Sequence, residues 1–159
     1  MAITLNVFIV NLTKLKKDFP EIVRILLEEK SKDFIKANTD NWNKGLMPSG
    51  EKLTNQFTNS TNYSLSWAAA RKEKGLPYDH YRLKFTGELE HSLNFDIKVK
   101  KGNITGNITI PPTELYAKGN DLYKMFGDFV GVPNEYLSIF VNWFQKELLK
   151  EIKFILFKS

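Results

Sequence analysis

The feature that most constrains this chain is a strict alternation of apolar and polar residues between Leu93 and Ile110. Every second side chain of residues 93–99 is apolar, and isoleucines resume the pattern after a short polar turn. Because successive side chains of a strand point to opposite faces, this spacing predicts two strands that share one apolar face. Gly102 and Asn103 lie between them and tolerate the positive φ of a tight turn. The sequence therefore predicts an antiparallel β-hairpin whose apolar face other elements must cover.

Two amphipathic segments are the expected cover for that face. Residues 13–37 carry apolar side chains at helical spacing with charged residues opposite, and the acid two positions before Pro20 marks a helix start after a turn. A second helical stripe begins after Pro133 and extends to about Ile152. The expected fold class is α+β, with an N-terminal amphipathic helix and a C-terminal helix packed on a small antiparallel sheet built around the β-hairpin.

The segments between these elements are shorter and less regular. Residues 38–50 predict a polar connector, and residues 63–74 predict a helix that Gly75 terminates. Residues 86–89 predict a short helical or turn step into the hairpin. A chain of 159 residues can bury a core of its own, so we expect a single domain.

The two ends of the chain carry separate expectations. Residues 1–11 predict a strand, because apolar side chains recur at every second position: Ile3, Leu5, Val7 and Ile9. Such a strand is either an edge strand of the same sheet or an arm that pairs with a neighbouring subunit, since a terminal strand presents free backbone hydrogen-bonding groups. Residues 153–159 either extend the last helix or form a tail.

The composition excludes several classes of protein. The chain contains no cysteine, which excludes disulfides and thiolate chemistry. We expect neither a signal peptide nor a membrane partner, because the apolar runs fall far short of the ~20 residues of a membrane span. The net charge of +5 is mild and acidic residues are interspersed, so charge alone gives only a weak attraction to polyanions.

No arrangement of residues predicts a catalytic, metal or cofactor site. His80 and His91 lack the spacing of zinc ligands, and no glycine-rich loop joins a strand to a helix in the way a phosphate site requires. Asp79 and His80 are adjacent, but no nucleophile motif accompanies them. We therefore expect that the protein is not an enzyme, and a small hydrolase that uses Asp79 and His80 is the third of three hypotheses.

Basic residues on the hairpin define the second hypothesis, a small basic nucleic-acid-binding module. Lys98, Lys100 and Lys101 fall on its polar side and are the candidate DNA-facing residues. A stacking platform would also need aromatic residues there, yet Phe95 falls on the apolar side. Trp143 lies off the apolar stripe of the last helix, which makes it a candidate contact residue.

Short motifs between residues 38 and 149 suggest a family. A Thr-Gly-x-Leu-x-x-Ser step leads into the hairpin, and a Tyr-Ala pair, a glycine and a Val-Pro pair precede the last helix. The motif residues in this sequence are Thr86, Gly87, Leu89, Ser92, Tyr116, Ala117, Gly127 and Pro133. The series resembles the tailed-phage virion-morphogenesis and head–tail connector (tail-completion, neck) proteins.

The resemblance implies the leading hypothesis, a structural component of a virion. Proteins of this family are not enzymes; they form rings at the portal–tail junction and line a passage for DNA. The resemblance therefore implies a homo-oligomer that is made in the host cytoplasm and assembles with portal, connector or tail subunits. Its candidate interface residues are those of the N-terminal strand together with Trp143.

Overall fold

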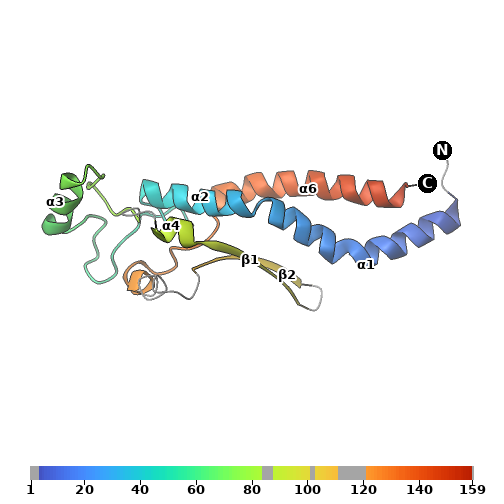
Figure 1. Cartoon of the computed structure of the whole chain (residues 1–159), viewed down its shortest axis with the longest axis horizontal. Coiled ribbons are helices and arrows are strands. Elements are labelled where there is room, and N and C mark those ends of the chain that lie inside the picture. Colours follow the sequence, from blue (N-terminus) through green and yellow to red (C-terminus); the bar gives the residue numbers. More distant parts are fainter. Residues whose placement is uncertain (1–3, 84–87, 101–102, 111–120, 159) are drawn as a thin grey trace. The chain divides into compact units, whose positions relative to one another are not determined.

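The protein has an α+β fold that divides into two compact units (Figure 1). The computed structural model describes residues 4–83, 88–100, 103–110 and 121–158. The first unit, called here the helical unit, comprises Met1–Ser31, Ile97–Gly106 and Leu137–Ser159. The second, called the loop unit, comprises Lys32–Asp96 and Asn107–Tyr136. The expected fold class is thus confirmed.

The helical unit is built on two long helices that run side by side in opposite directions (Figure 1): α1, Leu5–Glu29, and α6, Asn134–Leu156. At one end the ring of Phe8 lies 6.5 Å from that of Phe157, centroid to centroid. At the other end the ammonium group of Lys30 lies 4.8 Å from the centroid of the Trp143 ring. The predicted C-terminal helix is confirmed, and it includes the first residues of the segment that was left open as a tail.

The predicted N-terminal strand is wrong, because residues 5–9 form the first turns of α1. The side chain of Thr4 caps this helix by accepting a hydrogen bond from the backbone N–H of Val7 at 3.5 Å. Phe8 and Val10 occupy the positions between the alternating residues, so apolar side chains lie on opposite sides of the segment rather than on one pleated face. A continuous helix satisfies all its interior backbone groups, which an unpaired terminal strand does not.

The predicted helix start before Pro20 is also wrong, because α1 runs through this proline. Pro20 has no N–H, so the carbonyl of Lys16 loses its helical donor. Lys16 is exposed, and water can therefore replace the missing hydrogen bond. Figure 1 shows α1 bending near its middle, the usual consequence of a proline inside a helix.

The predicted polar connector begins seven residues too early, because helix α2 spans Ser31–Lys44. Asparagines favour turns over helix interiors, but two of them are buried here and bind loops of the same unit. The Oδ1 atom of Asn38 accepts a hydrogen bond from the N–H of Gly131 at 2.9 Å, and the amide of Asn41 donates to the carbonyl of Met47 at 3.1 Å. Tertiary contacts therefore extend the helix beyond its local preference.

The predicted hairpin is confirmed as an antiparallel pair of strands, β1 (Asn94–Lys100) and β2 (Asn103–Thr109). Its apolar face meets α2 where the ring of Phe95 stacks on that of Phe34 with centroids 4.7 Å apart. Ile108 and Ile110 are buried, whereas Val99 near the turn is half exposed. Helix cover on the apolar face is therefore shown near the base of the hairpin.

The core of the loop unit gathers residues from distant parts of the chain. Trp42 and Phe129 are fully buried against each other, and the indole N–H of Trp42 donates to the carbonyl of Phe129 at 2.7 Å. Leu53 and Phe126 are buried in the same unit. Two short helices complete the labelled elements, α3 (Leu65–Glu73) as expected and α4 (Glu88–Ser92), and residues 121–126 are also helical.

Candidate interaction surface

The long helices of the helical unit bury very little of their apolar surface. Every residue of α1 and α6 is described, and Leu26 is the single one of them that is fully buried. Large apolar side chains of both helices stand partly or mostly in solvent: Leu5, Val7, Ile9, Val10, Leu12, Phe19, Ile25, Leu137, Ile139, Val141, Leu149 and Phe154. Exposed large apolar side chains mark an interaction site in a soluble protein where they gather into a patch.

Helix α1 carries two apolar stripes rather than one. The first contains Phe8 and Leu15 and is partly covered within the chain. The second is spaced in steps of three and four residues, with Lys16 in its middle, and its apolar members are Leu5, Ile9, Leu12, Phe19 and Val23. Most of its members are exposed. A helix with two stripes contacts more than one neighbouring helix, and α6 accounts for one of them.

Helix α6 shows the same incomplete burial. Its predicted stripe includes Leu137 and Val141, yet both are more than a third exposed. Trp143, expected to stand clear of the stripe, is half-buried and contacts the ring of Phe140 at a centroid distance of 5.8 Å. Trp143 is therefore held within the helical unit by Lys30 and Phe140.

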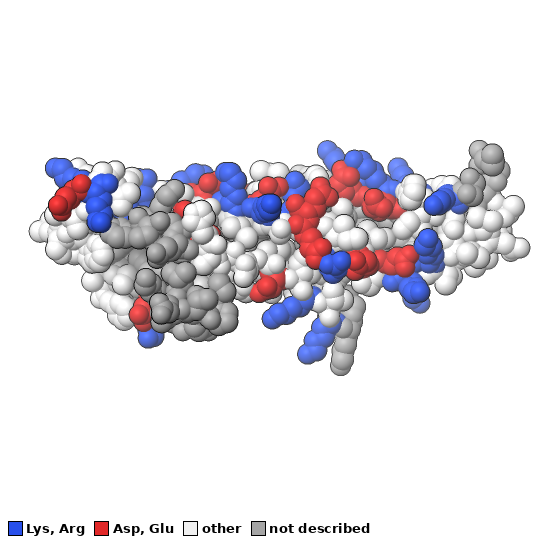
Figure 2. All heavy atoms as spheres, in the orientation of Figure 1, with Lys and Arg blue, Asp and Glu red and all other residues white. Residues whose placement is uncertain are grey.

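Charge is distributed unevenly along this pair of helices. Figure 2 shows red and blue side chains over the middle of the α1/α6 pair and mostly white atoms at the end where the chain termini lie. In the charged stretch Arg24 lies between Glu21 and Glu28, and its Nε donates to Glu21 at 2.8 Å. The side-chain hydrogen bond from Arg24 lowers the pKa of Glu21 below its ordinary value. The middle is thus polar, and the end is the candidate contact surface.

The candidate catalytic pair, Asp79 and His80, belongs with Arg82 to a cluster at the C-terminal end of α2, called here the brace. The Nε2 atom of His80 lies 3.1 Å from the carbonyl oxygen of Lys44, and its Nδ1 lies 2.7 Å from a carboxylate oxygen of Asp79. Arg82 donates to the carbonyl of Asn43 at 3.0 Å and also pairs with Asp79. The last carbonyls of a helix lack helical donors, and His80 and Arg82 supply them.

Sequence reasoning missed this capping role, although the signal was present in the residue types. Side chains with N–H donors, such as histidine and arginine, can bond the last carbonyls of a helix, and Asp79 contacts both His80 and Arg82. Gly45 follows the helix with φ of 73°, and a Cβ atom there would lie 2.6 Å from the carbonyl oxygen of Tyr81 and closer still to the His80 ring. The glycine therefore permits the close approach of the brace.

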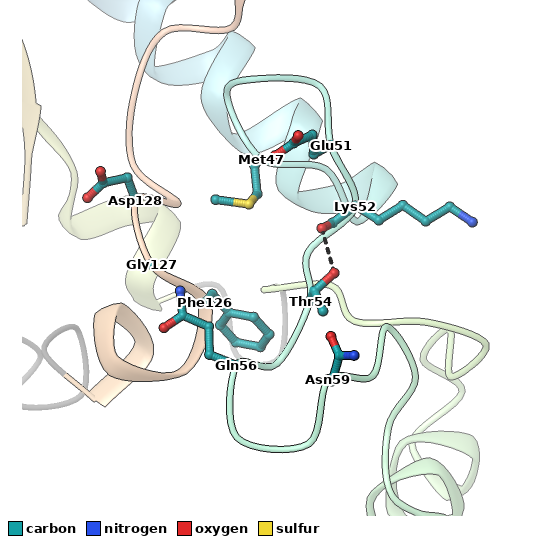
Figure 3. Close-up of a pocket in the computed structure, with 9 residues that line it drawn as sticks. All are labelled: Met47, Glu51, Lys52, Thr54, Gln56, Asn59, Phe126, Gly127 and Asp128. Carbon is teal, nitrogen blue, oxygen red and sulfur yellow. Dashed lines mark hydrogen bonds between the residues drawn. The ribbon is translucent and has the colours of Figure 1, made fainter.

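An open pocket of about 870 Å³ lies on the loop unit, between the loop after α2 and the segment around Gly127. Figure 3 shows that its charged groups do not converge: the ammonium of Lys52 and the carboxylate of Asp128 point in opposite directions, away from the centre. Thr54 donates its hydroxyl hydrogen bond to the carbonyl of Lys52 at 3.1 Å. Binding sites bring polar groups together around a ligand, and these side chains are not arranged in that way.

The family-motif residues that the structure describes lie in the loop unit, where each has a local structural role. The hydroxyl of Ser92 donates to the carbonyl of Leu89 at 2.9 Å within α4. Gly127 has φ of 72°, and a Cβ atom there would lie 2.7 Å from the amide nitrogen of Gln56. Pro133 is buried just before α6. The other motif residues lie outside the described ones: Thr86, Gly87, Tyr116 and Ala117.

The candidate DNA-facing lysines that are described lie on one face of β1. Lys98 and Lys100 are both exposed, and Figure 2 shows blue side chains projecting at the hairpin. Phe95 stacks inward on Phe34, as predicted from its side of the strand. Lys101 and the candidate interface residue Ile3 lie outside the described residues.

No three histidine or acidic side chains among the described residues lie close enough to bind a metal ion, and none of their helices is both long and apolar enough to cross a bilayer. Comparison with known proteins gives no match to a family model, a curated protein or a solved structure.

Proposed function

We propose that this protein is a structural subunit of a tailed-phage virion that assembles with copies of itself, as a ring in the neck or tail. The observation that carries the proposal is the apolar surface of the helical unit. Burial of apolar side chains is the main driving force of folding and association. Two long helices that fully bury a single residue have not reached that state within one chain.

The motif resemblance supplies the setting of the proposal. Two of the positions that the resemblance assigns to the motif precede α6: Gly127, which has a positive φ, and Pro133, which is buried. In the proposed role α6 and α1 carry the contact between subunits. The brace of Asp79, His80 and Arg82 then serves the loop unit and has no chemical task.

The experiment is a mass measurement on the purified protein combined with a search for it in particles. We expect light scattering after size exclusion to give a multiple of 18.4 kDa at micromolar concentration. We also expect the protein in purified particles at a fixed number of copies per particle. A strictly monomeric protein that is absent from particles would refute the proposal.

The second candidate function, a nucleic-acid contact, is favoured by the two exposed lysines of β1. Phosphate contacts make binding weaken with salt in proportion to the number of contacts, with a log–log slope of roughly −0.9 per phosphate on duplex DNA. A measured slope that decreases in magnitude for Lys98→Ala and Lys100→Ala would support this function. Salt-independent or absent binding would exclude it.

A further inference from the structure

The ring of His80 faces a hydrogen-bond acceptor at each of its two nitrogens. Its Nε2 atom lies 3.1 Å from the carbonyl oxygen of Lys44, and its Nδ1 atom lies 2.7 Å from a carboxylate oxygen of Asp79. A neutral imidazole has a single N–H, so it donates to only one of these two oxygens. Its other nitrogen then presents a lone pair to an oxygen that also presents lone pairs. The doubly protonated imidazolium, in contrast, donates to both oxygens.

Contacts that do not involve the ring nitrogens hold this ring in place. The N–H of Tyr81 donates to the carbonyl of Thr61 at 2.9 Å. The hydroxyl of Tyr63 donates to the carbonyl of Arg82 at 2.7 Å and accepts from its N–H at 2.8 Å. On the α2 side, a Cβ atom at Gly45 would lie only 2.9 Å from Nε2. The position of the ring is therefore set by the backbone around it.

The charged groups that the described part of the chain places at this ring come from two elements. They are Asp79 and Arg82 on the segment of the ring itself and Lys44 at the end of α2. The hydroxyls of Tyr63 and Tyr81 make hydrogen bonds elsewhere. The guanidinium of Arg82 lies 3.2 Å from the second carboxylate oxygen of Asp79, and Lys44 is exposed. Asp79 therefore has another cationic partner, and its side chain is 62% exposed and can turn toward water.

We infer that the brace is sensitive to pH, because His80 joins α2 to Asp79 only as an imidazolium. The neutral ring keeps its N–H on the carbonyl of Lys44, which is fixed in the helix backbone, and releases Asp79. Histidine side chains change charge between about pH 5 and 8, and an aspartate is ionised throughout this range. The stability that the second bond contributes is therefore present on the acid side of the range and lost on the alkaline side.

This inference is independent of the proposed function, because all residues of the brace and Lys44 lie within the loop unit. Its failure would leave the assembly proposal as it stands, and a monomeric protein would leave the pH-sensitive brace as it stands. The chain has only two histidines, and the second, His91 on α4, is exposed. His91 is therefore the matched control in each experiment.

Nitrogen-15 NMR of the ring nitrogens tests the inference in the wild-type protein, with His91→Gln used to assign the signals. We expect both nitrogens of His80 to be protonated at about pH 5.5. At about pH 8.5 we expect the tautomer with its proton on Nε2, because that N–H still has the carbonyl of Lys44 as its acceptor. A ring that is neutral at the lower pH, or that carries its proton on Nδ1 at the higher pH, would overturn the inference.

Urea denaturation at the same two pH values tests the effect on stability. His80→Gln keeps a side-chain N–H near the carbonyl of Lys44 but cannot change its charge. We expect the unfolding equilibrium constant of the wild type to rise between the two pH values by roughly three- to tenfold more than that of His80→Gln, the size of a partly exposed hydrogen bond to a charged group. His91→Gln is expected to retain the wild-type rise. Equal rises for His80→Gln and the wild type would overturn the inference.

Asp79→Asn tests the second bond while His80 stays in place. An amide at this position accepts from a protonated Nδ1 and donates to an unprotonated one, so both forms of the ring keep both bonds. We expect this variant to lose the additional rise of the wild type, as His80→Gln does. A rise equal to that of the wild type would show that Asp79 does not distinguish the two forms of the ring, which would also overturn the inference.

Discussion

The helical unit and the loop unit of this protein differ in how much regular secondary structure they contain and in how completely they bury their apolar side chains. The loop unit has little regular structure, yet it buries Trp42, Phe129 and Leu53 almost completely and fixes them with side-chain hydrogen bonds such as that from Trp42 to Phe129. The helical unit has long, regular helices and leaves most of their apolar residues partly exposed.

The difference shows that regular secondary structure and self-sufficiency are separate properties. Backbone hydrogen bonds within α1 and α6 need no tertiary partner, so these helices can form while their side chains remain uncovered. The loops of the loop unit do not form regular backbone hydrogen bonds of this kind. Side chains such as those of Asn38 and Asn41 therefore bond backbone groups of these loops. We therefore expect substitutions to act on folding in the loop unit and on assembly in the helical unit.

The largest expected effect is that of Trp42→Ala. The substitution removes a side chain that is 0% exposed and leaves a cavity together with an unpaired carbonyl at Phe129. We expect the free energy of unfolding to fall by roughly 3–5 kcal/mol, measured by urea denaturation. The counterpart in the helical unit is Trp143→Ala, which loses a half-buried ring and its contact with Lys30 and is expected to cost about 1 kcal/mol. Equal losses for the two tryptophans would remove the distinction between the units.

A smaller effect is expected from Gly45→Ala. The new Cβ atom would meet the His80 ring and the carbonyl of Tyr81, and φ of 73° is itself unfavourable for alanine. We expect a loss of about 2–4 kcal/mol in thermal or chemical denaturation. Gly75→Ala is the control, because Gly75 has φ of 66° but no atom within 4 Å of its would-be Cβ; it should cost about 1 kcal/mol. Equal losses of stability for the two variants would show that His80 and Tyr81 can move to accommodate the added methyl group.

The smallest effect is expected from Asp79→Asn. Desolvation raises the pKa of the Asp79 carboxyl, but its own backbone N–H, His80 and Arg82 together lower it below the ordinary value of 3.8. Folding therefore favours the carboxylate, so its contribution to stability is complete above that ordinary value and is lost as the pH falls through the lower folded value. Denaturation between pH 7 and pH 2 should show the two proteins converging at the acidic end. A constant difference down to pH 2 would contradict this.

The parts of the fold that could be predicted from the sequence are those set by local patterns. The alternation from Leu93 onwards specifies the hairpin, because a one-residue shift would reverse every side chain. The same reasoning failed at residues 5–9, where Phe8 already breaks the polar half of the pattern. The second stripe on α1 is visible in the sequence as the spacing of Leu5, Ile9 and Leu12, but a strand interpretation of that segment conceals it.

The core of the loop unit could not be predicted, because its contacts join distant segments and the sequence of one segment does not indicate which other segment it contacts. Nothing near Trp42 indicates that its indole N–H binds the carbonyl of Phe129, and nothing near Asn38 indicates Gly131. The brace at the end of α2 has the same origin, since His80 and Arg82 act on carbonyls more than thirty positions earlier. Such contacts follow from the three-dimensional path of the chain rather than from periodicity.

The bonds that Trp42 and Asn38 make have a consequence for biosynthesis. Their partners lie 87 and 93 positions later, so α2 of the nascent chain lacks these partners until the residues up to 131 have been synthesised. Closure over such separations is slow, and a chain released before that point lacks the groups that complete its core. We therefore expect a chain that terminates between the hairpin and Gly131 to be unstable and readily degraded.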